Sequence, residues 1–277
     1  MPEPTTVRLV VFDLAGTTID YGCQAPVGAF VAAFAGRGVA VTPEEARGPM
    51  GLHLKDHIRA MLQTRAVDQK WQAAVGRPWT EDDVEGLIRV AVPLQVEAAR
   101  RFGLLVPGAQ KCLAKLRRRG VKVATTTGYF REAAEACYAA LRSQQFEPDF
   151  TICADEVPTG RPAPWMVLRA MEALDAYPPA AVVKVGNTIA DIKEGCNAGV
   201  WSVGVTDTGN EMGLTHAEFS RLNGSERIQA RGAVKARLFA AGAHAVVHSV
   251  ADVPDLLDRI DRKLAAPNAR RQPFSGR

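Results

Sequence analysis

The sequence predicts an α/β protein with a doubly wound parallel sheet and an inserted helical cap. Three observations support this prediction. The run 7–12 is almost continuously apolar, as expected of a central parallel strand covered on both faces. Beyond residue 102, further short apolar runs alternate with helical patterns. The stretch 26–101, by contrast, contains helical patterns and little that is typical of a strand.

The predicted core consists of strands and helices in alternation. The strand-like runs lie at 7–12, 121–125, 150–153, 181–185, 201–205 and 245–247. The helical patterns of the core lie at 108–119, 130–143, 162–174, 189–198 and 252–264. This alternation predicts right-handed βαβ units and hence a parallel sheet.

A helical insertion follows the first strand. Its helical patterns lie at 27–37, 43–48, 53–64, 68–75 and 81–101. Thr42 and Thr80 are good helix starts, because each puts a hydroxyl cap before an acidic first turn. We therefore expect a catalytic core of residues 1–22 and 102–266 and a cap of residues 23–101. We expect the tail, 267–277, to be disordered.

The composition is that of an ordinary globular protein. The 277 residues are 47% hydrophobic and 23% charged, with a net charge of +4. The five cysteines form no CxxC pair, which indicates reduced thiols and not a disulfide framework or a zinc site. No apolar run reaches the roughly 20 residues that span a bilayer, and the N-terminus lacks a signal pattern. We expect a cytoplasmic protein with no membrane or nucleic-acid partner and a small anionic substrate.

The first predicted strand ends at a carboxylate, in the run Asp13-Leu14-Ala15-Gly16-Thr17-Thr18. In open α/β sheets, ligands bind beyond the carboxyl ends of the strands. A carboxylate there can attack phosphorus and form an aspartyl-phosphate, which splits one difficult displacement into two. The alternative is an aspartate that only caps a turn, and this motif alone does not separate the two.

Further polar segments follow other predicted strands. Thr126-Thr127-Gly128 offers a hydroxyl and backbone N–H groups that suit phosphoryl oxygens. The segment from Gly186 to Asp191 places a metal-binding oxygen, on Asn187, and a supporting carboxylate near the first motif. Between these segments, Arg161 offers a cation for a transferring phosphoryl group.

In this order and spacing, the motifs resemble the haloacid dehalogenase superfamily and, within it, the phosphonoacetaldehyde hydrolase (phosphonatase) family. The resemblance covers residues 7–264. It is specific because most superfamily members have an acid/base Asp where this chain and the phosphonatases have Ala15. The segments that carry the resemblance are 13–23, Pro49-Met50-Gly51, Asp56-His57-Ile58-Arg59, Thr126-Thr127-Gly128-Tyr129, Gly160-Arg161-Pro162-Ala163-Pro164-Trp165-Met166 and Lys184-Val185-Gly186.

The resemblance implies hydrolysis of phosphonoacetaldehyde to acetaldehyde and phosphate, with Mg²⁺ as cofactor. It makes Asp13 the nucleophile. The implied metal site consists of Asp13, the backbone oxygen of Ala15, Asn187 and, in support, Asp191. The implied phosphoryl-binding residues are Thr127 and Arg161, with Gly128 beside them. The implied residues on the aldehyde side are Cys23, Met50, Tyr129 and His57, the last also a catalytic candidate. For Met50 and Cys23, core packing is an equally good explanation.

The first departure from the family concerns a lysine. The family uses a cap lysine that condenses with the aldehyde, so that an iminium accepts the electrons of the broken bond. Here that position falls on Leu54, and the nearby lysine is Lys55. One residue turns a helix by about 100°, so a shifted backbone would be needed to bring Lys55 to the aldehyde. The alternative is that Lys55 is a solvated surface lysine.

The second departure is Asn187, where the family has a metal-binding Asp. An amide oxygen can ligate magnesium but is neutral, so we expect a weaker site unless Asp191 helps. His53 is a candidate replacement acid/base, and the alternative is an exposed histidine without a role.

Three functions therefore stay open. The first is phosphonoacetaldehyde hydrolysis with Lys55 forming the imine. The second is cleavage of another phosphonate or of a phosphate ester without a Schiff base. The third is a non-catalytic relative that binds a phosphorylated ligand. The resemblance also implies a homodimer through the cap, for which the apolar face of 27–35 could serve, although that face could equally be cap core.

Overall fold

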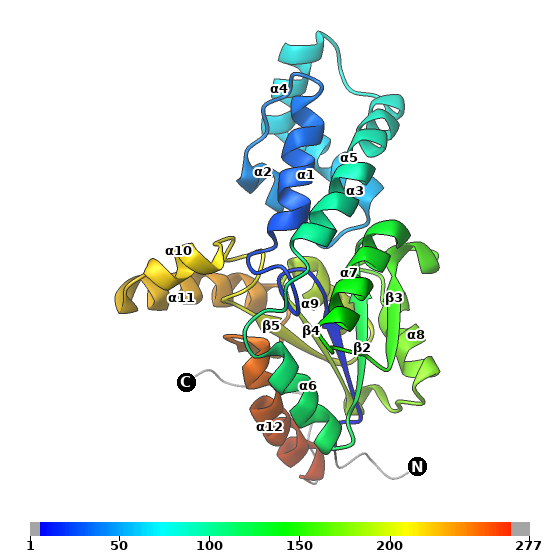
Figure 1. Ribbon diagram of the computed structural model, residues 1–277, viewed down its shortest axis with the longest axis vertical. Helices are drawn as coiled ribbons and strands as arrows, with labels where there is room; N and C mark the ends of the chain where they lie inside the picture. Colours follow the sequence, from blue (N-terminus) through cyan, green and yellow to red (C-terminus); the bar gives the residue numbers. More distant parts are fainter. Residues whose placement is uncertain (1–5, 267–277) are drawn as a thin grey trace.

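The computed structural model describes residues 6–266 and contains a parallel sheet with the strand order β3-β2-β1-β4-β5-β6 (Figure 1). The strands are β1 (Leu9–Asp13), β2 (Lys122–Thr127), β3 (Phe150–Cys153), β4 (Val182–Gly186), β5 (Trp201–Val205) and β6 (Ala245–Val247). The predicted fold class is confirmed. β1 lies between β2 and β4, where the chain reverses its direction across the sheet, and ligands of doubly wound sheets bind at such a point.

Helices cover both faces of the sheet. They are α6 (Ala109–Arg118), α7 (Arg131–Ser143), α8 (Trp165–Ala173), α9 (Ile189–Asn197), α10 (His216–Arg221), α11 (Gly224–Ala240) and α12 (Val253–Ala265). Successive residues of β1 point to opposite faces. Val11 belongs to the same apolar cluster as Val167 of α8, whereas Val10 belongs to the cluster of Leu116 in α6 and Leu257 in α12.

Two of these helices, α10 and α11, are missing from the sequence prediction. Helix α11 is largely exposed, and its buried residues are Val234 and Leu238, so it lacks a strong apolar stripe. A local signal was present nonetheless. Asn223 and Glu226 form a capping box at the start of α11, with the backbone N–H of Glu226 donating to the side chain of Asn223.

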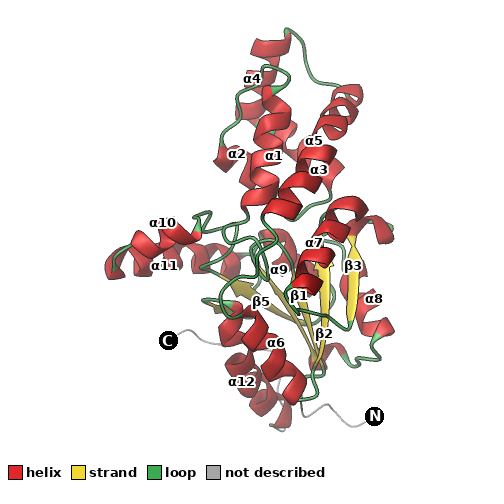
Figure 2. Cartoon of the chain, in the orientation of Figure 1, coloured by secondary structure: helices red, strands yellow, loops and turns green. Residues whose placement is uncertain are grey.

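Between β1 and α6 the chain forms five helices, which we call the cap helices: α1 (Gln24–Ala35), α2 (Pro43–Arg47), α3 (Leu54–Gln63), α4 (Arg65–Val75) and α5 (Glu81–Arg101). They stand together beyond one end of the sheet (Figures 1 and 2). The proposed domain boundaries near residues 22 and 101 stay predictions.

The apolar face of α1 is cap core. Val27, Phe30 and Phe34 are all buried within the chain, where α1 packs along α5. This corrects the suggestion that the face serves as a dimer interface, because buried side chains are not available to a second subunit. The homodimer itself stays a prediction.

The connection from core to cap is anchored by Asp20. Its two carboxylate oxygens accept the backbone N–H groups of Gln24 and Ala25, both at 2.9 Å, at the start of α1. Burial raises the pKa of Asp20 to about 7. Arg47 of α2 donates to the carbonyl oxygens of Gly22 at 2.8 Å and Gly213 at 3.1 Å, which ties the cap to the loop after β5.

Within residues 6–266, no helix has both the length and the apolar character that crossing a membrane requires. The five cysteines are free thiols. The tail predicted to be disordered, 267–277, lies outside the described residues.

Candidate active site

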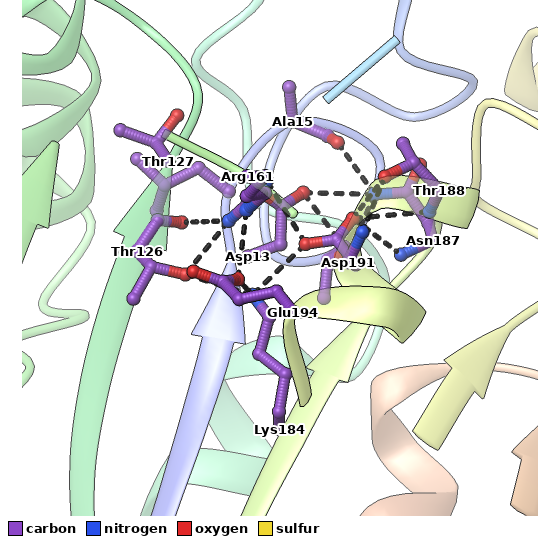
Figure 3. A network of polar contacts seen from close by, with 12 residues as sticks. Asp13, Ala15, Thr126, Thr127, Arg161, Lys184, Asn187, Thr188, Asp191 and Glu194 are labelled. Carbon is purple, nitrogen blue, oxygen red and sulfur yellow. Dashed lines mark hydrogen bonds and ion pairs between the residues drawn. The ribbon is translucent and has the colours of Figure 1, made fainter. Parts of the chain in front are cut away.

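The candidate site lies at the carboxyl ends of β1, β2 and β4. Asp13 is the last residue of β1 and pairs in register with Thr126 of β2. Asn187 directly follows β4, and Asp191 lies in the first turn of α9. The three strand-end motifs therefore converge, as the parallel topology predicts, and Figure 3 shows their side chains gathered around Asp13.

Arg161 holds Asp13 in place. Its Nη1 contacts Asp13 Oδ1 at 2.8 Å and Asp191 Oδ1 at 3.0 Å. Its Nε donates to Glu194 at 2.9 Å, and its Nη2 donates to the carbonyl and hydroxyl oxygens of Thr126 at 3.0 and 2.8 Å. Four of these contacts are hydrogen bonds, and the fifth, to Asp191, is an ion pair. Arg161 therefore orients the carboxylate, and its predicted contact with phosphoryl oxygens stays a prediction.

Lys184 completes this buried network (Figure 3). Its Nζ lies 2.8 Å from Thr126 Oγ1, 3.0 Å from Asp191 and 3.2 Å from Glu194. Sequence reasoning assigned no role to Lys184 or Glu194. For Lys184, a signal existed, because a lysine within an otherwise apolar central strand must find buried partners.

The network sets the protonation of its carboxylates. Burial, and then the Asp191 carboxylate, raise the pKa of Asp13 to about 6 against the opposing charge of Arg161. Burial acts in the same direction on Asp191, but the charges of Arg161 and Lys184 outweigh it and lower the pKa of Asp191 to about 2. Asp191 is thus a fixed negative charge, whereas Asp13 remains available as a nucleophile at neutral pH.

Asn187 does not take the position of a metal ligand. Its Nδ2 donates to Asp13 Oδ2 and the Ala15 carbonyl oxygen, both at 2.9 Å (Figure 3). The same Nδ2 lies 2.8 Å from Thr17 Oγ1. Its Oδ1 accepts the backbone N–H of Asn210 at 2.8 Å. The oxygens of Asp13 and Ala15 thus converge as predicted, but on an amide N–H group, which cannot ligate a cation.

The predicted supporting ligand, Asp191, is also engaged elsewhere. Its Oδ2 accepts the Thr188 hydroxyl at 2.7 Å and the Thr188 N–H at 3.1 Å, as the partner of a helix cap. Within the described part of the chain, no cluster of three His, Cys, Asp or Glu side chains could hold a metal ion. Because the Asn187 amide presents its N–H groups to the oxygens of Asp13 and Ala15, and Asp191 caps α9, this arrangement does not fit the predicted magnesium site.

Thr127 and Gly128 stand at the phosphoryl side of the site. The backbone N–H of Tyr129 donates to Thr127 Oγ1 at 3.3 Å, which leaves the hydroxyl proton of Thr127 free to donate. A Cβ atom at Gly128 would lie 2.6 Å from the carbonyl oxygen of Gly51. Glycine is thus required at 128 because the cap loop approaches the end of β2 this closely.

A pocket opens from Asp13 toward the cap helices. Its walls are mostly apolar on the cap side and polar on the core side. The lining residues are Asp13, Ala15, Cys23, Pro26, Phe30, Met50, Gly51, Leu52, Leu54, His57, Gln95, Thr127, Gly128, Tyr129, Arg161 and Thr188. All four residues predicted on the aldehyde side, Cys23, Met50, His57 and Tyr129, thus line one pocket with Asp13.

His57 is a neutral residue of this wall. It stacks on Phe30 with ring centroids 3.8 Å apart, and burial lowers its pKa to about 3. Its Nε2 lies 2.9 Å from the carbonyl oxygen of Ala46, and since a carbonyl only accepts, Nε2 carries the proton. His57 Nδ1 is therefore an acceptor, which suits binding better than proton donation.

The lysine predicted to form the imine does not line the pocket. Lys55 pairs with Glu85, and its side chain is 40% exposed, whereas Leu54 is 5% exposed and lines the pocket. The shift of one position on α3 therefore places the amine outside. His53 also lies outside the lining and contacts Asp155 at 2.8 Å, so neither residue reaches Asp13 in this arrangement.

Gln95 of α5 lines the pocket, although sequence reasoning overlooked it. Its side chain is 2% exposed, and within residues 6–266 it forms no hydrogen bond to another side chain or to the backbone. Its spacing gave a usable signal. Gln95 continues the buried stripe of Val84, Leu87 and Ala91, where a polar side chain needs a partner.

Comparison with known proteins places these features in a family. Residues 7–199 match the family model of the haloacid dehalogenase-like hydrolases. A phosphonoacetaldehyde hydrolase of Syntrophobacter fumaroxidans is 40% identical over 95% of each chain. A phosphonoacetaldehyde hydrolase-like protein of the same organism is 39% identical over the same share of each chain.

Solved structures agree with this placement. A phosphonoacetaldehyde hydrolase-like protein from Oleispira antarctica superposes with a TM-score of 0.92 at 36% identity, covering 94% of each chain. A hydrolase from Pseudomonas syringae has a TM-score of 0.67 at 19% identity, covering 92% of this chain and 99% of its own, and supports the fold alone.

Proposed function

We propose that this chain, which belongs to the phosphonoacetaldehyde hydrolase family of haloacid dehalogenase-like hydrolases, hydrolyses the carbon–phosphorus bond of a small phosphonate. The observation that carries the proposal is the single pocket in which Asp13, held by Arg161, faces apolar walls from the cap helices. A nucleophile at one end and an uncharged wall at the other suit a phosphonate with a small, uncharged organic part.

The proposed first step is attack of an Asp13 carboxylate oxygen on phosphorus. An oxygen–phosphorus bond forms, the carbon–phosphorus bond breaks, and its electron pair leaves with the carbon. Thr127 is placed to donate its hydroxyl proton to a phosphoryl oxygen. In the second step, water attacks phosphorus of the aspartyl-phosphate, and phosphate and free Asp13 are regenerated.

Ala15 favours a phosphonate over a phosphate ester. It lines the pocket and offers a methyl group where an acid would protonate a leaving alkoxide. An ester would therefore lose its leaving oxygen without help from this position. A carbon leaving group next to a carbonyl does not need that acid, because the carbonyl oxygen takes the electron pair as an enolate.

Phosphonoacetaldehyde is the first substrate to test, because the named relatives are phosphonoacetaldehyde hydrolases at up to 40% identity. Cleavage would leave the enolate of acetaldehyde, which takes up a proton from water. A lysine imine would accept the electrons more readily, but within the described residues no lysine lines the pocket. We therefore propose cleavage without an imine from Lys55.

A second candidate function is cleavage of a phosphate ester or of another phosphonate whose leaving group needs neither an imine nor an acid. The same absence of a pocket lysine favours it. Hydrolases of this superfamily generally use a divalent metal, but the donor set around Asn187 supports no step through Mg²⁺ here. The cytoplasmic location and the homodimer remain predictions.

The test is phosphate release from phosphonoacetaldehyde and from a panel of small phosphonates and phosphate esters, with Asp13→Asn as the control. Borohydride is added in parallel. Release from phosphonoacetaldehyde that borohydride does not inhibit supports the proposal. Inactivation by borohydride, with an adduct mapped to Lys55, would overturn cleavage without an imine. Release from esters alone would favour the second candidate.

A further inference from the structure

The side-chain amide of Asn187 stands at the point where three oxygens converge. Its Nδ2 lies 2.9 Å from Asp13 Oδ2, 2.9 Å from the Ala15 carbonyl oxygen and 2.8 Å from Thr17 Oγ1. Each of these partners can accept an N–H. The amide therefore makes the contacts with the nucleophile's second oxygen that a bound cation would otherwise make.

The orientation of this amide follows from its other end. Asn187 Oδ1 accepts the backbone N–H of Asn210 at 2.8 Å. A backbone N–H can only donate, so a flipped amide would place two donors against each other. The –NH₂ group of Asn187 must consequently point at Asp13, and its oxygen must point away.

The side chain of Asn187 is closely surrounded by the chain. Asn187 is fully buried. A Cβ atom at Gly16 would lie 2.7 Å from Asn187 Oδ1, and one at Gly209 would lie 2.7 Å from Asn187 Cβ. The backbones of Gly16 and Gly209 thus lie closely against the side chain of Asn187.

From these observations, we propose that the Asn187 amide takes the place of a divalent cation at Asp13, so that this chain holds its nucleophile without a resident metal. Asp13 Oδ1 is held by Arg161 and Oδ2 by Asn187. An aspartate at position 187 would instead bring a second carboxylate to within hydrogen-bond distance of Asp13, and the pair would need a cation between them. The inference rests on the proposed function only in naming Asp13 as the nucleophile.

The test measures metal binding without turnover. The wild-type chain, freed of metal with a chelator, is titrated with Mn²⁺ under electron paramagnetic resonance, with Mg²⁺ as competitor and Asp13→Asn as control. We expect no Mn²⁺ site that depends on Asp13, and the same Tm in EDTA as in excess Mg²⁺. One Mn²⁺ site that Mg²⁺ displaces and that Asp13→Asn abolishes would overturn the proposal.

Asn187→Asp provides the converse measurement. If the amide is what excludes the cation, this isosteric variant gains one Mn²⁺ site that the wild type lacks, and its Tm rises with Mg²⁺. A folded variant that gains no site would contradict the proposal. The wild-type titration is decisive even if the variant fails to fold.

Activity is measured separately. Wild-type phosphate release that is equal in EDTA and in Mg²⁺ agrees with the inference, and release that requires Mg²⁺ at Asp13 contradicts it. An inactive wild-type protein without a metal site would refute the proposed function alone, because the binding result does not depend on turnover.

Discussion

The two walls of the pocket differ in charge and polarity. The core wall holds Asp13 in a buried network of carboxylates and cations whose donors are paired inside the protein. The cap wall presents apolar side chains and the neutral groups of His57 and Gln95. The difference indicates a division of labour, because fixed charges suit phosphoryl transfer whereas neutral walls select the organic part of a substrate.

The largest expected effect comes from the core wall. Asp13→Asn keeps the size of the side chain but removes the nucleophile. We expect phosphate release to fall by about 10³-fold or more. Steady-state kinetics measure this, with thermal unfolding as the control for folding. Activity within tenfold of wild type would show that Asp13 is not the nucleophile.

The cap wall can be converted to imine chemistry. Leu54→Lys brings an amine into the pocket at the position where the family has its lysine, and we expect one borohydride-trapped adduct per chain with an aldehyde substrate. Peptide mass mapping locates the adduct. Lys55→Ala in the wild-type background is the matched comparison. An adduct that forms in the wild-type chain and that Lys55→Ala abolishes would mean that α3 moves when substrate binds.

A substitution at Gln95 tests whether the cap wall contributes to substrate binding. Gln95→Leu retains most of the volume and removes the amide, which makes no other hydrogen bond within the described chain. Loss of one hydrogen bond to a substrate should raise KM by about tenfold with little change in kcat. Ile88→Ala, on the same helix but outside the pocket lining, is the control. An unchanged KM would remove Gln95 from the binding site.

The buried His57 predicts that the stability of the fold depends on pH. Burial lowers its pKa from 6.5 to about 3 in the folded chain. The imidazole of His57 therefore stays neutral in the folded state, whereas in the unfolded state it takes up a proton below pH 6.5. Its contribution to stability is therefore present above pH 6.5 and is lost as the pH falls toward 3, by about 1.4 kcal/mol per pH unit. Urea unfolding at pH 7 and pH 5 measures this. The free energy of unfolding of the variant His57→Gln should fall less steeply over that range. A fall as steep as in the wild type would contradict the lowered pKa of His57.

The smallest effect is expected for Lys55→Ala. Lys55 forms an exposed pair with Glu85 outside the pocket. We expect kcat/KM to stay within about twofold of wild type and stability to change by less than about 1 kcal/mol. A large loss of activity with an unchanged Tm would restore Lys55 as a catalytic candidate.

The sequence by itself determined the fold class and identified the strand-end residues of the core wall, but not Lys184 or Glu194. The apolar run of β1 and the alternation of strands and helices require a parallel sheet, and parallel strands bring their carboxyl ends to one edge. Asp13, Thr127 and Asn187 were identifiable for that reason, since each lies within two residues of the end of a strand pattern. Helices α10 and α11 were missed because their burial pattern is too weak to predict them.

Only the tertiary structure decided the direction of individual side chains. Leu54 and Lys55 are neighbours in the sequence, but the packing of α3 places Leu54 in the pocket and Lys55 at the surface. The role of Asn187 likewise depends on the backbone N–H of Asn210, a residue 23 positions away. A local pattern carries no information about such a distant donor, and that donor determines whether the amide presents oxygen or nitrogen to Asp13.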